Sequence, residues 1–143
     1  IGEHGDTELP VWSSANVSGI DLADFCKVCG KCADMAGLHG IYEEVKNSAY
    51  RIIERKGATN YAIAKAVRRI AEAIVRDENS VLPVSGLADG HYGLHDLCLG
   101  LPAIVGREGI KQILDFPLDE AEHRALEASA AALADVLAEI EPN

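Results

Sequence analysis

Apolar residues recur at helical spacing along two consecutive stretches of the chain. The first stretch runs from Gly40 to Gly57 and the second from Thr59 to Ile74, with charged residues between the apolar positions. The apolar positions are Ile41, Val45, Ala49, Ile52 and Ile53 in the first stretch, and Ile63, Val67, Ile70, Ala71 and Ile74 in the second. This spacing predicts two amphipathic helices. Gly57 is expected to end the first helix, and Thr59 is a suitable N-cap for the second.

The segments that follow have the composition of strands. Residues 79–89 and 97–105 are apolar runs bounded by turn residues, and residues 110–116 alternate apolar and polar positions. The sequence GREG at 106–109 is a turn signal, so the last two segments are predicted to form a hairpin. The sequence HYGLHD between the first two strands is expected to be a loop.

A long helix is predicted at the end of the chain. Asp119 and Glu122 have the spacing of a capping box, with Asp in place of Ser or Thr. The apolar face behind them consists of Leu126, Ala130, Leu133, Leu137 and Ile140. Residues 1–20 are expected to be irregular or extended, and residues 21–35 to form a short helix or loop. The predicted fold is therefore α+β, with long helices packed against a small, mainly antiparallel sheet.

Composition narrows the class of protein. A length of 143 residues is that of about one domain, and the net charge of −10 would be repelled by a phosphate backbone. Nucleic acids and anionic membrane surfaces are therefore not expected partners, and no apolar run approaches the ~18 residues of a membrane span. Four cysteines are too few for a disulfide scaffold, which favours a reducing, cytoplasmic location. The opening IGEHGD resembles the end of a strand cut from a longer chain.

Three of the cysteines form a run that suggests a metal site. Cys26, Cys29 and Cys32 stand at C-x2-C-x2-C spacing, which is part of a bacterial iron–sulfur motif. No fourth cysteine follows at the required distance, and a zinc set completed by His39 matches no common spacing. Because free cysteine behaves as a small apolar residue, the preferred interpretation is a buried helix edge without metal.

His4 is the histidine with the most suggestive surroundings. It lies on a short loop between Gly2 and Gly5 with Glu3 and Asp6 beside it, and glycines allow the backbone to approach a ligand closely. A histidine held on such a loop can give or take a proton near neutral pH. On spacing alone this signal is weak, and the other histidines are interpreted as loop or surface residues.

Three segments resemble the L-lactate dehydrogenase family. GEHGDTELPVWS at 2–13 resembles the segment of the catalytic histidine, and VKNSAYRIIERKGATNYAIA at 45–64 resembles a long helix followed by a substrate-side threonine. NSVLPVSG with DGHYGLHDLCLGLPAIVGREGI, at 79–110, resembles the closing sheet. The resemblance covers nearly the whole chain, and the cysteine run falls where it is weakest. It implies the C-terminal substrate domain of such an enzyme over residues 1–143.

The resemblance implies a reaction and roles for four residues. The family reduces pyruvate to L-lactate with NADH, and uses NAD in the reverse direction. His4 would be the catalytic acid and base, Thr59 and Ala49 would line the substrate pocket, and Ile63 would pack against the nicotinamide. Read from the residues alone, Thr59 would be only a helix cap, and Ile63 and Ala49 only core. The resemblance also implies a homotetramer and leaves activation by fructose 1,6-bisphosphate open.

The chain departs from the family by lacking its NAD-binding half. No G-x-G-x-x-G follows a strand, so the fingerprint of the N-terminal Rossmann domain is absent. The aspartate that orients the histidine and the arginines that hold the substrate would lie upstream of Ile1. The chain by itself is therefore expected to be inactive. Two alternatives stay open: a malate dehydrogenase of the lactate-dehydrogenase-like type, and a non-catalytic oligomerisation domain.

Overall fold

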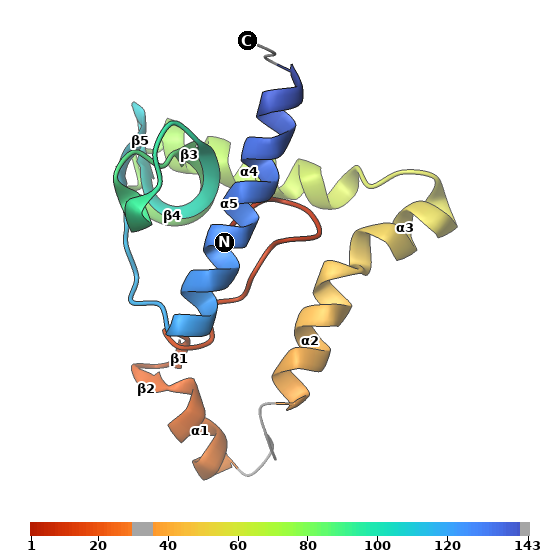
Figure 1. The fold of residues 1–143 in the computed structure, drawn as a ribbon, viewed down its shortest axis with the longest axis vertical. Coiled ribbons are helices and arrows are strands. Elements are labelled where there is room, and N and C mark those ends of the chain that lie inside the picture. The colour runs from red at the N-terminus through yellow and green to blue at the C-terminus, as the bar shows by residue number, and fades with distance from the viewer. Residues whose placement is uncertain (30–35, 141–143) are drawn as a thin grey trace.

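The computed structural model describes residues 1–29 and 36–140, and Figure 1 shows how their elements are arranged. Helix α5 crosses the molecule beside the sheet (Figure 1). Helices α2 and α3, together called the helical limb, lie on the other side of α5 from the sheet (Figure 1). The elements in chain order are β1 (Asn16–Val17), β2 (Ile20–Asp21), α1 (Leu22–Cys29), α2 (Ala36–Lys46), α3 (Ser48–Lys56), α4 (Tyr61–Val75), β3 (Ser80–Leu87), the 3₁₀ turn η1 (His91–Gly93), β4 (Cys98–Gly106), β5 (Gly109–Ile113) and α5 (Glu120–Ile140). This confirms the predicted combination of helices with a small antiparallel sheet.

The main sheet has three antiparallel strands in the order β3-β4-β5, so β4 is central. The predicted hairpin is confirmed, but β5 ends at Ile113 rather than at residue 116. Contacts with η1 occupy the residues that follow. Asp115 Oδ1 lies 2.8 Å from His91 Nδ1, and the Phe116 N–H donates to the Tyr92 hydroxyl at 2.7 Å. The Phe116 carbonyl also accepts from the Tyr92 hydroxyl, at 3.3 Å, so neither backbone group of Phe116 is available to continue the ladder.

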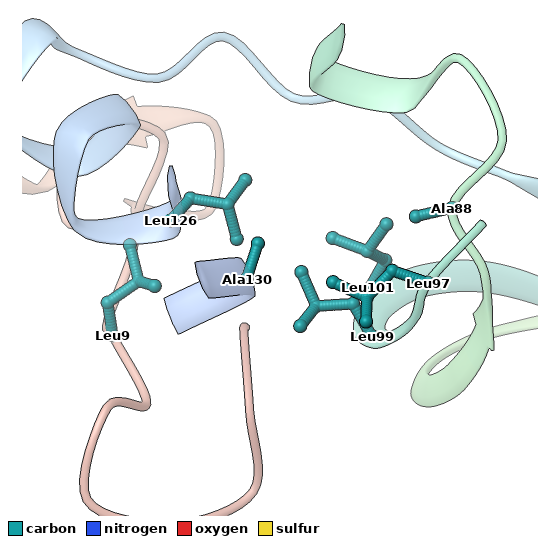
Figure 2. Close-up of a cluster of buried hydrophobic side chains, with 7 residues drawn as sticks. All are labelled: Leu9, Ala88, Leu97, Leu99, Leu101, Leu126 and Ala130. Carbon is teal, nitrogen blue, oxygen red and sulfur yellow. The ribbon is translucent and has the colours of Figure 1, made fainter. Parts of the chain in front are cut away.

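The core lies between β4 and α5 (Figure 2). Every second residue of β4 is buried, as expected for a strand with one covered face. Figure 2 shows the leucines of this face opposite side chains of α5 and of the N-terminal segment. The cluster consists of Leu9, Ala88, Leu97, Leu99, Leu101, Leu126 and Ala130. It joins the first ten residues of the chain to the last helix, which places the His4 loop beside α5.

The first predicted helix is divided at Asn47 into α2 and α3. The Asn47 side-chain amide donates to the Glu43 carbonyl at 2.8 Å, and the Asn47 backbone N–H donates to the same oxygen at 3.1 Å. The Asn47 side chain and backbone thus share one helical acceptor, and the single helix predicted for this stretch is divided into two at this residue. Gly57 ends α3 as predicted, with a left-handed φ of 76° that glycine adopts without strain.

The N-cap position of α4 is Asn60 and not Thr59, and the Asn60 side chain makes no capping hydrogen bond. The first bond of the helical ladder runs from the Ala64 N–H to the Asn60 carbonyl at 2.9 Å, so Thr59 lies one residue ahead of the cap. The predicted capping box of α5 is confirmed. The Glu122 N–H donates to Asp119 Oδ1 at 2.8 Å, and the Asp119 N–H donates to Glu122 Oε2 at 3.0 Å.

The apolar face predicted for α5 is only partly buried. Leu126 and Ala130 belong to the core and Leu133 packs against it, whereas Leu137 is 44% and Ile140 70% exposed. The surfaces of α2, α3 and α4 also carry exposed aliphatic side chains, among them Val45, Ile53 and Val67. These side chains have no cover within the part of the chain that the structure describes.

The cysteine run falls on α1 and on the residues after it. Cys26 is buried and Cys29 is half-buried, which agrees with a buried helix edge, while Cys32 lies outside the described residues. Within residues 1–29 and 36–140, no group of three or more His, Cys, Asp or Glu side chains is arranged to hold a metal ion. Among the same residues, no helix has the length and apolar character needed to cross a membrane.

Candidate active site

The His4 loop, residues 2–7, is attached to the central strand of the sheet, β4, by backbone hydrogen bonds. Gly2 and Gly100 exchange two backbone hydrogen bonds, of 2.9 and 3.0 Å. Below the loop, the Ile1 amino group and the Leu9 N–H each donate to the other residue's carbonyl, at 2.8 and 2.9 Å. A Cβ on Gly100 would lie 2.8 Å from the Gly2 carbonyl oxygen, so this close approach requires glycine. The base of the loop is therefore fixed by backbone contacts.

The inside of the loop is fixed by a side-chain network. The Glu3 carboxylate accepts hydrogen bonds from the Thr7 N–H, at 3.1 Å, and from the Thr7 hydroxyl. A Cβ on Gly5 would overlap with Glu3 Oε1, so a larger residue there would require the Glu3 carboxylate to move. Ser129 of α5 accepts the Glu3 N–H at 2.7 Å and lies 3.2 Å from the Thr7 hydroxyl oxygen. Each of these residues thus has a part in holding the loop closed.

His4 and Asp6 are the two side chains that the network leaves on the outside. Both are exposed, whereas Gly2 is buried and Glu3, Gly5 and Thr7 are partly buried. The loop therefore presents an imidazole to its surroundings on a backbone that is held at both ends. Such an arrangement suits a proton-transfer group, because the ring can reach a bound molecule while its position stays defined.

His4 also lines an open cavity of about 830 Å³ between the N-terminal segment, α4 and the sheet. Most of its wall is apolar, for example Ile70 and Ile74 of α4 and Pro83 of β3. Glu8, Ser85 and Cys98 supply polar atoms on the remaining sides. Thr59, Ala49 and Ile63 are not among the lining residues, so this cavity unites His4 with none of the other three predicted site residues.

Two tyrosines of the helical limb form hydrogen bonds to the His4 loop and to the residue that follows it. The Tyr50 hydroxyl of α3 donates to Asp6 Oδ1 at 3.1 Å, and the Tyr42 hydroxyl of α2 donates to the Glu8 carbonyl at 2.6 Å. The pKa of Tyr50 is raised, first because its phenol donates to Asp6 and then because that carboxylate repels a phenolate. Ala49 precedes Tyr50 on α3 and is exposed, so it lies on the segment that this bond draws to the loop.

Thr59 and Ile63 lie at the joint between α3 and α4. Thr59 is partly buried, and Ile63, in the first turn of α4, is 56% exposed. No hydrogen bond or shared cavity connects either residue to His4 within the part of the chain that the structure describes. Thr59 and Ile63 thus place one polar and one apolar side chain at the start of α4, where a ligand bound at the surface of this domain could contact them.

A buried carboxylate fixes the segment that follows the loop. Glu122, in the first turn of α5, is only 8% exposed. It accepts the Ser13 N–H at 2.9 Å on Oε1, and the Ser13 hydroxyl and the Asp119 N–H on Oε2. Sequence reasoning found the capping role of Glu122 but missed Ser13, Glu3 and Ser129. Only the pairing of distant segments could reveal these contacts, since they span more than a hundred residues.

Comparison with known proteins places this fold and loop in one class. The family model described as the lactate/malate dehydrogenase α/β C-terminal domain matches residues 1–142. The chain therefore belongs to the lactate/malate dehydrogenase family and represents its C-terminal domain.

The similar proteins named here are all L-lactate dehydrogenases. The chain is 52% identical to the L-lactate dehydrogenase of Acetivibrio thermocellus over 96% of its length, and 50% identical to that of Thermoanaerobacterium saccharolyticum over 99%. The crystal structure of the minor L-lactate dehydrogenase from Enterococcus mundtii in a ligand-bound form matches with a TM-score of 0.92 and 35% identity over 99% of the chain. The chain covers 43%, 45% and 45% of these three proteins, so it spans less than half of their length.

Proposed function

We propose that this chain is the substrate domain of an L-lactate dehydrogenase, which interconverts pyruvate and L-lactate with NADH and NAD. One observation carries the proposal: the exposed His4 imidazole stands on a loop whose other side chains and backbone hold it in place. The two most similar relatives named above, at 50% identity or more, are L-lactate dehydrogenases, which favours lactate over malate chemistry.

His4 would move the proton in this reaction. In pyruvate reduction, the protonated imidazole donates its proton to the carbonyl oxygen, and its charge stabilises the negative charge that develops there. NADH supplies the hydride to the carbonyl carbon, so that one hydride and one proton convert the ketone to the alcohol. In the reverse direction, the neutral imidazole takes the hydroxyl proton of lactate.

The remaining three predicted residues are proposed to complete the pocket. Thr59 would offer a hydroxyl to the substrate from the start of α4, and Ala49 would form part of the wall beside the Tyr50–Asp6 bond. Ile63 fits the nicotinamide, because its half-exposed aliphatic side chain suits the flat face of the ring. The chain contains no dinucleotide fingerprint, so residues outside it would hold most of the cofactor.

The chain by itself is proposed to be inactive. A catalytic histidine needs a second group that fixes its tautomer and stabilises its charged form. Within residues 1–29 and 36–140, the His4 imidazole has no hydrogen-bond partner. The orienting group and the residues that bind the substrate carboxylate would belong to the NAD-binding half of the enzyme.

The proposal is tested by joining this chain to the N-terminal half of the Acetivibrio thermocellus enzyme. NADH oxidation is followed by absorbance with pyruvate and, separately, with oxaloacetate. We expect turnover with pyruvate in the joined protein and none in the chain alone. Absence of turnover in a folded, NADH-binding joined protein would overturn the proposal, and a preference for oxaloacetate would favour malate dehydrogenase.

Substitution of His4 separates catalysis from assembly. His4→Asn should lower kcat by a factor on the order of 10² to 10⁴, because the proton donor is lost. His123→Asn is the matched control, since His123 lies on α5 outside the His4 loop and its Nδ1 pairs with Glu127 Oε1 at 3.3 Å. Equal turnover of both variants would support the alternative of a non-catalytic oligomerisation domain.

Exposed apolar surface favours an oligomer. Side chains such as Val45 of α2, Ile53 of α3 and Val67 of α4 are about half exposed, which is typical of surfaces that are covered by another domain or subunit. We propose a homotetramer for the complete enzyme, and light scattering of the joined protein measures its mass.

A further inference from the structure

We propose that Ser129 is a positioning residue for His4, acting through the Glu3 N–H and the Thr7 hydroxyl. The proposal rests on the proposed function, in which His4 transfers the proton. Ser129 lies on α5, 126 residues from Glu3, and its side chain is completely buried. It is the residue of α5 that hydrogen-bonds the His4 loop, within the part of the chain that the structure describes.

The direction of each hydrogen bond in this network follows from its groups. The Thr7 hydroxyl has one proton and gives it to the Glu3 carboxylate, which can only accept when ionised. Thr7 Oγ1 must then accept the proton of Ser129 Oγ, 3.2 Å away. Ser129 Oγ in turn accepts the Glu3 N–H at 2.7 Å. Ser129, Thr7 and Glu3 thus form a closed ring of donors and acceptors, and one of its members, Glu3, directly precedes His4 in the sequence.

The ring of Ser129, Thr7 and Glu3 holds the part of the loop that carries His4, which we call the tip, and not the base of the loop. The base is held by the backbone pairs Gly2–Gly100 and Ile1–Leu9, which do not involve Ser129. The tip carries His4 and is tied to the rest of the domain through Ser129 and through the Tyr50–Asp6 bond. Loss of the Ser129 hydroxyl therefore leaves the loop attached but allows Glu3 and His4 to shift.

Ser129→Ala removes the hydroxyl and tests this role in the joined protein. We expect kcat for pyruvate reduction to fall by about 10- to 100-fold, because a displacement of about 1 Å is enough for such a loss. The KM for NADH should stay within about twofold, since the loop base and α4 are unchanged. Ala130→Gly is the matched control: it weakens the same helix at the adjacent buried position and keeps the serine.

A purely structural role gives a different result. In that case Ser129→Ala and Ala130→Gly would lower the melting temperature to a similar extent, and the two variants would have the same kcat. That result would overturn the proposal. Thr7→Val adds a second test, because it breaks the ring while keeping the shape of the side chain. If the ring acts as a unit, the double variant Ser129→Ala/Thr7→Val loses no more kcat than Ser129→Ala alone. Additive losses would contradict the ring.

A measurement on the chain itself distinguishes this inference from the proposed function. In NMR spectra of the chain, Ser129→Ala should shift the His4 ring signals and speed the hydrogen exchange of the Glu3 amide, with Ala130→Gly leaving both unchanged. This outcome supports the positioning role even if the joined protein shows no turnover with pyruvate, a result that would overturn only the function. Unchanged His4 and Glu3 signals in Ser129→Ala would overturn the positioning role whatever the enzyme does.

Discussion

The Tyr50 hydroxyl donates a hydrogen bond of 3.1 Å to the Asp6 carboxylate and so joins α3 to the His4 loop. The two residues are 44 positions apart, and both are exposed. Asp6 is only two residues from His4, so the position of the helical limb is linked directly to the position of the imidazole. A ligand that moves α3 would therefore also act on the loop.

The Tyr50–Asp6 bond predicts a pH-dependent contact. The Asp6 carboxylate raises the pKa of Tyr50 above its ordinary value of 10.0, so the protonated phenol is the stabilised form. The contact is therefore fully present below pH 10 and is lost as the pH rises through the raised pKa of Tyr50. We expect Asp6→Asn to bring the NMR titration midpoint of the Tyr50 ring back toward its ordinary value. Asp21→Asn, on the exposed β2, should leave it unchanged, and an equal effect of both would contradict the bond.

Substitution of Gly100 should destabilise the domain. The added Cβ of Gly100→Ala would press on the Gly2 carbonyl oxygen, and relief of this overlap costs about 1–3 kcal/mol of unfolding free energy. Gly37→Ala in α2 is the matched control, because its Cβ meets no atom within 4 Å. There the same substitution should stabilise the helix by about 0.5–1 kcal/mol. Chemical denaturation measures both, and a loss of stability in Gly37→Ala would contradict the helix at that position.

Removal of the Glu122 carboxylate should also weaken the fold. Glu122→Ala leaves the Ser13 N–H and the Asp119 N–H without their acceptor, at a cost of about 1–3 kcal/mol each if they stay dry. Glu139→Ala, on the exposed end of α5, is expected to change stability by less than about 0.5 kcal/mol. Thermal unfolding distinguishes the two. Equal midpoints would mean that water replaces the carboxylate.

Asp77 should contribute to stability above its pKa. The Arg107 N–H and then Lys111 hydrogen-bond its carboxylate, which lowers the pKa of Asp77 below its ordinary value of 3.8. A lowered pKa gives stability that is present above pH 3.8 and is lost as the pH falls through the value in the folded state. Asp77→Asn should therefore lower the melting temperature at pH 7 more than at pH 3. A difference that grows on acidification would contradict this sign.

The sequence was informative where a local cause of structure has a recognised residue pattern. Gly57 ends α3, and Asp119 with Glu122 begins α5, because these effects depend on residues within one turn. The joint at Asn47 was missed because its side chain competes for a carbonyl that the apolar pattern does not reveal. The early end of β5 was missed for a different reason: η1, which precedes β4, takes the groups of Asp115 and Phe116.

The candidate site was predictable in part. The glycines around His4 indicate a tight loop, and the resemblance to the lactate dehydrogenase family singles out that histidine. Periodicity cannot show that Ser129 accepts the Glu3 N–H, because this contact joins opposite ends of the chain. Thr59 and Ile63 are placed together at the start of α4, but their roles depend on a ligand and on residues that this sequence does not contain.

The contact between Glu3 and Ser129 also bears on the order of folding. Strands β3 and β4 pair through a short connection, from Leu87 to Cys98, whereas the Glu3–Ser129 contact forms only when both ends of the chain have met. Because long closures cost more entropy and form later than local hairpins, we expect the sheet to assemble before the loop. A protease that cuts α5 before Ser129 would thus remove the contact to Glu3 and, with Ala130, part of the core that covers β4. The integrity of the last helix becomes a condition for the position of the fourth residue.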